Sequence, residues 1–282
     1  MAVAVPPGHV LVATDLSPRA GLALIRAAQL AHEHGARLTV LHVVPAEIVA
    51  DMADPARRTV EAHLVEYLDS APVDIAIRRG PAAGEIAAEA AEREVDLVVV
   101  GAHGADWPTD VLLGSTAENL VRMTPAPVLL VKQPTTAAYR TVILAVDMSP
   151  PAADSARLAT RMTPTADHYL VHVCTVVGEN LMRMYGVGDD QIETLRRTST
   201  RQAREHIAQL TETLNPRPSQ VKITSGHPRT RVLELCRSWA ADLVAVGTGA
   251  RSPMSYAVLG SVAQHVMRQT RADVLVVPAA EA

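Results

Sequence analysis

Short apolar runs rich in β-branched residues alternate with longer, alanine-rich stretches along the first half of the chain. The runs at residues 9–15, 37–44, 73–79, 95–100 and 126–131 predict strands. The stretches at residues 18–35, 55–70, 82–94 and 115–123 have apolar positions at helical spacing and predict helices, the first ending at Gly35. Continuously apolar strands that alternate with helices are typical of a parallel sheet covered on both faces. The pattern therefore predicts a doubly wound α/β fold.

This pattern occurs twice in the chain. HVLVATDLSP, from residue 9, returns as TVILAVDMSP from residue 141, and DLVVVGAHG, from residue 96, returns as DLVAVGTGA from residue 242. Internal repetition of this kind indicates duplicated domains. We predict two tandem domains, residues 1–136 and 137–282, each with a five-stranded parallel sheet; they are called the first and second copy below. The second copy is longer in its middle, after Val173.

Composition excludes several classes of function. The chain has 26 basic and 30 acidic residues, a net charge of −4, and only 2% aromatic residues. Nucleic-acid binding needs a basic patch and often stacking rings, so it is not expected. Two cysteines, Cys174 and Cys236, are too few for a disulfide framework or a zinc site. The sequence shows no signal-peptide pattern and no long apolar run, so we expect a cytoplasmic protein without membrane contact.

The stretch GAHGADWPTDVLLGST, residues 101–116, joins the fourth predicted strand to the next helix. In a doubly wound sheet, ligands bind beyond the carboxyl ends of the strands where the connections diverge, which here places Asp15 beside Gly101. Gly114 and Ser115 stand where free N–H groups at a helix start favour an anion. Glycines there permit left-handed backbone and close approach of a phosphate, and Ser115 either caps the helix or donates to the phosphate.

Each of these features alone has an ordinary structural explanation. Gly101 fits a turn after a strand, and Ser115 fits a helix cap. The P-loop pattern and the G-x-G-x-x-G pattern are both missing from the sequence. The joint pattern, with an aspartate ending the first strand, is what indicates a phosphate-containing ligand.

Gly101-x2-Gly104-x9-Gly114-Ser115, after an apolar strand and with Asp15 ending the first strand, resembles the nucleotide-binding pattern of the universal stress protein family. The resemblance covers nearly the whole chain as two tandem copies, and it implies a Rossmann-like fold that binds ATP, either free or with Mg²⁺. It assigns residues to the ligand in three groups: Asp15 and Val43 to the adenine, Gly101 and Gly104 to the ribose and phosphate region, and Gly114, Ser115 and Thr116 to the phosphates.

The second copy departs from the pattern at one position. The matching residues are Asp147, Val173, Gly247, Gly260 and Ser261. Ala250 stands where the first copy has Gly104, and Gly249 lies one place earlier. If that backbone needs a positive φ, alanine costs about 1 kcal/mol. We therefore expect the first copy to hold the stronger site.

Neither a metal site nor catalytic machinery is predicted. His32 and His34 point to different faces of one helix and do not suit a shared metal. His42 and His172 recur at equivalent strand positions, which favours a structural role. A G-x-S-x-G nucleophile turn is missing, and the motif places no base beside the phosphates.

The leading hypothesis is a non-catalytic, adenine-nucleotide-binding stress protein that acts as a sensor or regulator. The first alternative is a scaffold of the same fold that binds no nucleotide and works through protein partners. The second is a slow ATPase or a nucleotidyl-transfer relative.

The fifth strand of each copy, residues 128–131 and 274–277, is predicted to be an apolar edge strand. Exposed apolar edges invite pairing, so we predict that the two copies form a pseudo-dimer through these strands. Dimers of whole chains are a further possibility.

Overall fold

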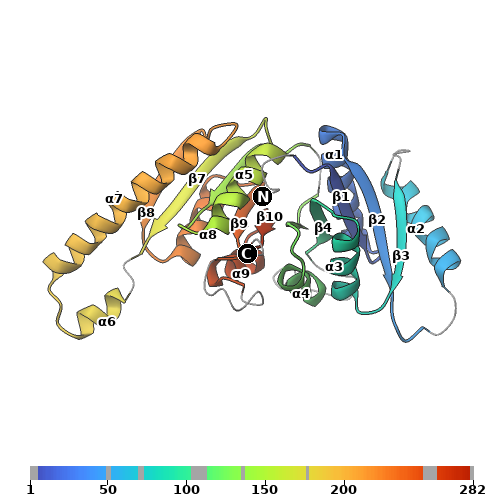
Figure 1. The fold of residues 1–282 in the computed structure, drawn as a ribbon, viewed down its shortest axis with the longest axis horizontal. Helices are drawn as coiled ribbons and strands as arrows, with labels where there is room; N and C mark the ends of the chain where they lie inside the picture. The colour runs from blue at the N-terminus through green and yellow to red at the C-terminus, as the bar shows by residue number, and fades with distance from the viewer. Residues whose placement is uncertain are drawn as a thin grey trace.

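The computed structural model describes residues 6–48, 52–68, 73–102, 113–134, 137–175, 178–249 and 259–279. Within them, ten strands form one sheet in the order β3-β2-β1-β4-β5-β10-β9-β6-β7-β8 (Figure 1). The strands are β1 (His9–Thr14), β2 (Arg37–Val44), β3 (Asp74–Arg79), β4 (Leu97–Gly101), β5 (Val128–Val131), β6 (Thr141–Ala145), β7 (Asp167–Cys174), β8 (Gln220–Ser225), β9 (Leu243–Gly247) and β10 (Asp273–Val277).

Each half of the sheet consists of five parallel strands, and the two halves have the same strand order. The second half repeats the arrangement around β6, which pairs with β7 on one side and β9 on the other. The predicted fold, two tandem doubly wound α/β units with a five-stranded parallel sheet each, is confirmed. The boundary between residues 136 and 137 stays a prediction, within the connection from β5 to β6.

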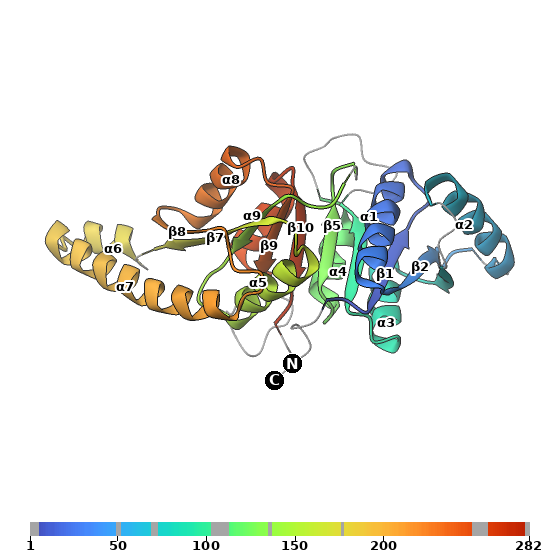
Figure 2. The same ribbon diagram turned by 90° about the horizontal axis from the view of Figure 1, so that it is seen from above.

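Helices cover both faces of the sheet (Figure 2). One face carries α1 (Pro18–His34), α2 (Ala53–Tyr67), α5 (Pro150–Met162) and α7 (Asp189–Thr213), and the other carries α3 (Ala82–Glu92), α4 (Ser115–Met123), α8 (Pro228–Ser238) and α9 (Ser261–Gln269). The first helix shows why the boundaries fall where they do. Ser17 accepts a hydrogen bond from the Ala20 amide, and Gly35 ends the helix with a left-handed φ of 62°, as predicted.

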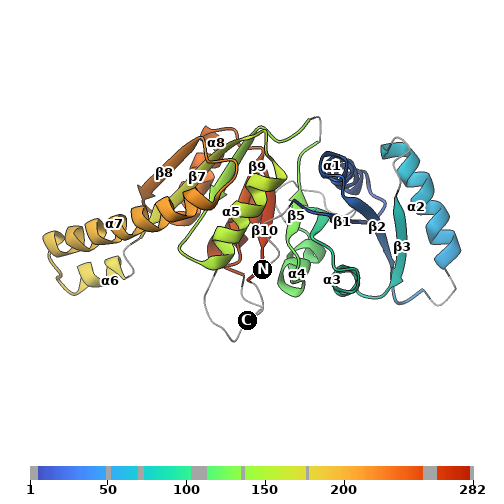
Figure 3. The same ribbon diagram turned by 45° about the horizontal axis from the view of Figure 1, so that its top comes forward.

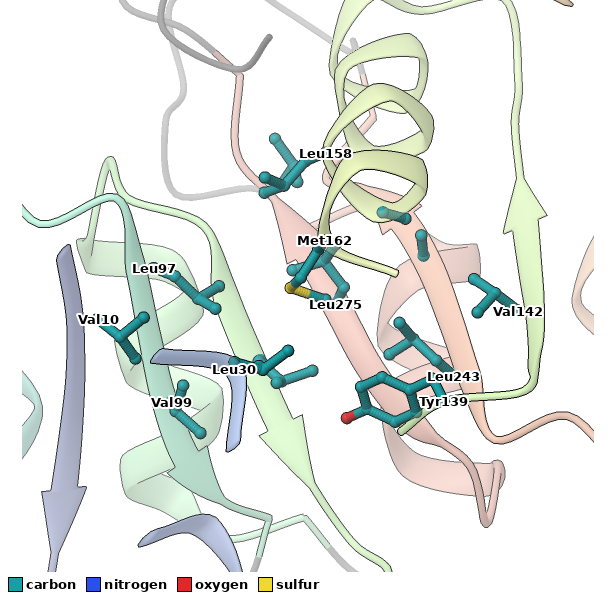
Figure 4. Packing of buried hydrophobic residues seen from close by; sticks show 14 of the residues in the cluster. Val10, Leu30, Leu97, Val99, Tyr139, Val142, Leu158, Met162, Leu243 and Leu275 are labelled. Atoms are coloured by element: carbon teal, nitrogen blue, oxygen red, sulfur yellow. The ribbon is translucent and has the colours of Figure 1, made fainter. Parts of the chain in front are cut away.

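Successive side chains of each strand point to opposite faces of the sheet, so they pack in two different hydrophobic clusters. Val10 and Val12 of β1 join the cluster under α1 and α5, whereas Leu11 joins the cluster under α3 and α4. The first of these clusters also contains residues of the second copy, such as Val142 and Leu243 (Figure 4). The second cluster likewise contains residues of both copies, so the hydrophobic core on each face of the sheet continues from one copy into the other.

The two half-sheets join through β5 and β10, which pair antiparallel at the middle of the sheet (Figure 3). Leu275 lies opposite Leu129 at the centre of this pairing, and all residues of both strands are buried. The predicted pseudo-dimer through the fifth strands is confirmed. Polar contacts support it: a ring nitrogen of His34 lies 2.9 Å from the Met162 carbonyl oxygen, and Glu118 accepts a hydrogen bond from Arg268 at 2.7 Å. The Arg268 guanidinium lowers the pKa of Glu118 to about 2.

The extra length of the second copy forms α6 (Glu179–Met184) and the long α7. α7 has 25 residues, whereas α2, at the corresponding place in the first copy, has 15. Three of its buried residues, Ala203, Ile207 and Leu210, lie in its C-terminal half. Its N-terminal half, where Ile192 is buried, packs with α6 beyond the edge of the sheet (Figure 1).

Candidate functional site

A cavity of about 530 Å³ opens at the carboxyl ends of β1, β2 and β4, beside the start of α4. It lies where β1 leads into α1 on one face of the sheet and β4 leads toward α4 on the other, which is the usual ligand position in doubly wound folds. The residues of the predicted site that line it are Asp15, Val43, Gly101, Gly114, Ser115 and Thr116. Gly104 lies outside the described residues.

Asp15 follows directly after β1 and is fixed by the start of α1. Its Oδ1 accepts hydrogen bonds from the Ser17 amide at 3.0 Å and from the Ser17 hydroxyl at 2.5 Å. Between them, Leu16 takes a φ of 66°, and its amide donates to the Thr14 hydroxyl at 3.0 Å. A leucine in the left-handed region is strained, and such strain is common at ligand sites. This turn could not be predicted from the sequence, because leucine is not a residue that favours a left-handed conformation.

His42 also lines the cavity, although its position in the sequence suggested only a structural role. Its Nδ1 lies 2.9 Å from the carbonyl oxygen of Thr14. Since a carbonyl only accepts, the Nδ1 donates this hydrogen bond, and the Nε2 is left to face the cavity. His42 therefore fixes the end of β1 and adds a polar group to the cavity. Lining residues such as Leu41, Ala82 and Ile86 carried no recognisable motif.

The start of α4 forms a backbone cradle at one side of the cavity. The Gly114 amide donates to the Ala102 carbonyl at 2.8 Å, and the Ala102 amide donates to the Val131 carbonyl at 3.0 Å. Gly114 is the N-cap and offers no side-chain cap, so the first amides of α4 keep their capacity to bind an anion.

Two details of this cradle differ from the sequence-based expectation. Ser115 is the first residue of α4 and not its cap. Gly114 has a φ of −63°, and Gly260 has a φ of −56°, so neither needs the left-handed region that only glycine favours. At Gly260 the constraint is space, because a Cβ would lie 2.6 Å from the Thr248 carbonyl oxygen.

The second copy repeats much of this geometry. Asp147 accepts hydrogen bonds from the Ser149 amide and hydroxyl, and the His172 Nδ1 lies 3.0 Å from the Val146 carbonyl oxygen. The equivalent cradle is also present, with the Gly260 amide donating to Thr248 at 2.7 Å. Val173 is the next-to-last residue of β7, Gly247 ends β9, and Ser261 begins α9. Ala250 lies outside the described residues, and Gly249 before it has a φ of 85°.

Gly247, the counterpart of Gly101, has a packing role that the motif did not reveal. A Cβ at this position would overlap the backbone nitrogen of Ala152 and lie 2.5 Å from the carbonyl carbon of Pro151. The first turn of α5 therefore rests directly on the end of β9, because residue 247 has no side chain.

Gly247→Ala is expected to destabilise the protein by about 1–3 kcal/mol, since overpacking against backbone forces the helix to shift. Urea denaturation followed by circular dichroism measures this. Gly188→Ala is the matched control, because a Cβ at Gly188 would meet no atom within 4 Å and its φ is −63°. Equal denaturation midpoints for Gly247→Ala and the wild type would contradict the packing role.

Among the described residues, no group of three histidine, cysteine or acidic side chains is placed to hold a metal ion. Cys236 is buried, and burial raises the pKa of its thiol to about 12. No helix in the described parts of the chain is long and apolar enough to cross a membrane.

Comparison with known proteins agrees with this architecture. The universal stress protein family matches residues 7–132 and again residues 138–278, so the chain belongs to this family as a tandem two-domain member. A universal stress protein of Mycolicibacterium smegmatis is 28% identical over 95% of this chain and 96% of its own length.

Solved structures share the tandem fold. A universal stress protein from Archaeoglobus fulgidus matches 98% of this chain and 99% of its own with a TM-score of 0.65 and 20% identity. A protein of unknown function from Pseudomonas aeruginosa PAO1 matches 96% of this chain and 93% of its own with a TM-score of 0.67, also at 20% identity. Likeness at this level of identity shows the fold alone.

Proposed function

We propose that the first copy binds an adenine nucleotide, ATP either free or with Mg²⁺, and that the chain acts as a non-catalytic sensor or regulator in a stress response. The observation that carries the proposal is that Asp15, Val43, Gly101, Gly114, Ser115 and Thr116 all line the same cavity. These residues lie at the ends of β1, β2 and β4 and at the start of α4, and they are distant from one another in the sequence.

The chemistry of the cavity suits the two ends of such a ligand. A carboxylate at Asp15 accepts a hydrogen bond from the N6 amino group of adenine, and the apolar neighbours Leu41 and Val43 suit the face of a base. The first amides of α4 and the positive end of its dipole suit phosphate oxygens, with Ser115 and Thr116 as hydroxyl donors. The same roles in the second copy would fall to Asp147, Val173, Gly247, Gly260 and Ser261.

Mass spectrometry of the freshly purified, denatured protein tests the proposal. An adenine nucleotide released in near-stoichiometric amount is the expected result. Absence of any nucleotide, together with no change in thermal midpoint on adding ATP, favours the scaffold alternative. Steady release of phosphate from ATP, lost in Asp15→Asn, favours the slow ATPase.

The two copies should contribute unequally to binding. Asp15→Asn is expected to lower the affinity for ATP about 10- to 150-fold, since it replaces a charged acceptor, worth about 1.5–3 kcal/mol, with an amide donor facing an amino group. The asparagine oxygen still accepts from Ser17, so the turn into α1 is retained.

Asp147→Asn is the matched control, because Asp147 makes the same contacts with Ser149 in the second copy. It should leave the affinity of the dominant site largely unchanged. Calorimetric titration that shows the reverse order of the two variants would place the stronger site in the second copy.

A further inference from the structure

Asp273 is a fully buried carboxylate at the junction of the two copies, and the nucleotide site does not use it. It begins β10, where the equivalent residue of the first copy is Pro127. Its Oδ1 accepts hydrogen bonds from the amides of Lys132 at 2.7 Å and Gln133 at 3.1 Å. Its Oδ2 accepts from the Tyr139 hydroxyl at 2.6 Å.

Arg26 of α1 supplies a buried positive charge to the same place. Its Nε lies 3.7 Å from the Asp273 Oδ2, and its guanidinium lies over the Tyr139 ring, 3.8 Å from the ring centre. Its Nη1 donates to the Ala137 carbonyl at 3.0 Å. The residue at the equivalent position of α5 is Leu158, which is apolar and buried (Figure 4).

Lys132 is the second cation of the junction. Its Nζ donates to the carbonyls of Met267 at 2.6 Å and Thr270 at 2.9 Å, which lie at the C-terminal end of α9. Burial lowers the pKa of Lys132 to about 8, so the position is strongly desolvated. Its equivalent in the second copy is Pro278. Both cations therefore belong to the first copy, and the buried acid belongs to the second.

The paired strands themselves do not select a partner. β5 and β10 are both short, apolar and completely buried. Their antiparallel register, in which Val274 faces Leu130 and Val276 faces Val128, is symmetric about the Leu129–Leu275 pair. Each strand could adopt this geometry with its own counterpart from another chain, as in isologous dimers.

The buried charges at the junction make such pairing of identical copies unfavourable. In a pairing of two second copies, each Asp273 would keep Tyr139 but lose Arg26 and the amides of Lys132 and Gln133. In a pairing of two first copies, Pro127 would take the place of Asp273, so Arg26 and the amides of Lys132 and Gln133 would lose their acceptor. A buried charge left without its partners is strongly unfavourable, so both like-with-like pairings are penalised.

We propose that the buried network of Asp273, Arg26, Lys132 and Tyr139 is a pairing-specificity device that makes the first copy the only suitable partner of the second copy at the β5–β10 surface. Assemblies of whole chains must then use a different surface.

The test uses the intact chain with a protease recognition sequence inserted between Thr135 and Thr136. The folded protein is cleaved, mixed with its ¹⁵N-labelled equivalent and incubated in mild urea until the halves have exchanged; native mass spectrometry then counts the pairs. The wild type is expected to give pairs of unlike halves, with like-with-like pairs at least about tenfold rarer than in a random mixture.

Asp273→Asn removes the charge and should raise pairs of two second copies about tenfold or more, whereas Asp154→Asn, which removes a surface carboxylate paired with Arg157, should change nothing. If the Asp273 variant does not fold, Arg26→Leu, which introduces the residue found at the equivalent position of α5, is examined for pairs of two first copies in the same way. A random mixture from the wild type, or variants that pair as selectively as the wild type, would overturn the proposal.

Discussion

Gly114→Val should weaken ATP binding about 30- to 150-fold, corresponding to about 2–3 kcal/mol. The φ of −63° and ψ of 144° at Gly114 are open to any residue, so the backbone conformation itself does not forbid valine. The branched side chain would instead stand in the cavity that Gly114 lines, beside the first amides of α4. Phosphate oxygens could then no longer approach those amides.

Gly260→Val is the matched control for this prediction. A side chain at Gly260 would meet the Thr248 carbonyl of the second cradle, so the variant places the same substitution at the corresponding helix start without touching the first cavity. The affinity of the first-copy site for ATP in this variant should stay within about twofold of the wild-type value, a difference well below 1 kcal/mol. Equal affinities for Gly114→Val and the wild type would rule out the start of α4 as the phosphate cradle.

Asp273→Ala should lower the free energy of unfolding by about 3–5 kcal/mol, because it leaves the Arg26 guanidinium and the backbone amide of Lys132 without their buried acceptor. The thermal midpoint should fall by roughly 6–15 °C for a chain of this size. Differential scanning calorimetry measures both quantities.

Asp154→Ala is the comparison, since Asp154 forms a partly exposed i,i+3 ion pair with Arg157. Such pairs contribute about 0–1 kcal/mol, so its midpoint should hardly move. An Asp273→Ala protein that unfolds at the same temperature as Asp154→Ala would show that the network adds nothing to the stability of the junction.

Much of the fold could be predicted because its signals are local and repeated. Continuous apolar runs predicted the strands of the first copy, and apolar positions at helical spacing predicted its helices. The repeated sequence pattern then predicted the same elements in the second copy. The pairing of β5 with β10 followed from one physical rule, that an apolar edge strand seeks a partner.

The site could be predicted only in part. Asp15 and Gly114 carried recognisable signals because an acid after a strand and a glycine before a helix are informative in the sequence. The strained φ of Leu16 has no such signal, and the pattern that assigns Gly247 to a ligand does not reveal that its missing side chain makes room for α5. Residue type alone does not distinguish these two uses of glycine.

The junction network was invisible in the sequence for a different reason. Arg26, Lys132 and Asp273 lie far apart in the chain, and each taken alone has the pattern of an ordinary surface charge. Only the pairing of the two half-sheets brings them together, with Arg26 and Asp273 buried. Long-range polar contacts of this kind have no period or motif by which to recognise them.

Calorimetric titration of the nucleotide-free wild-type chain with ATP tests the central claim most directly, because it reports affinity and stoichiometry together. The account predicts one dominant site per chain, located in the cavity of the first copy, with any second site at least about tenfold weaker, a gap of about 1.4 kcal/mol. Two equal sites per chain, or no binding heat with ATP either in the presence or in the absence of Mg²⁺, would contradict it.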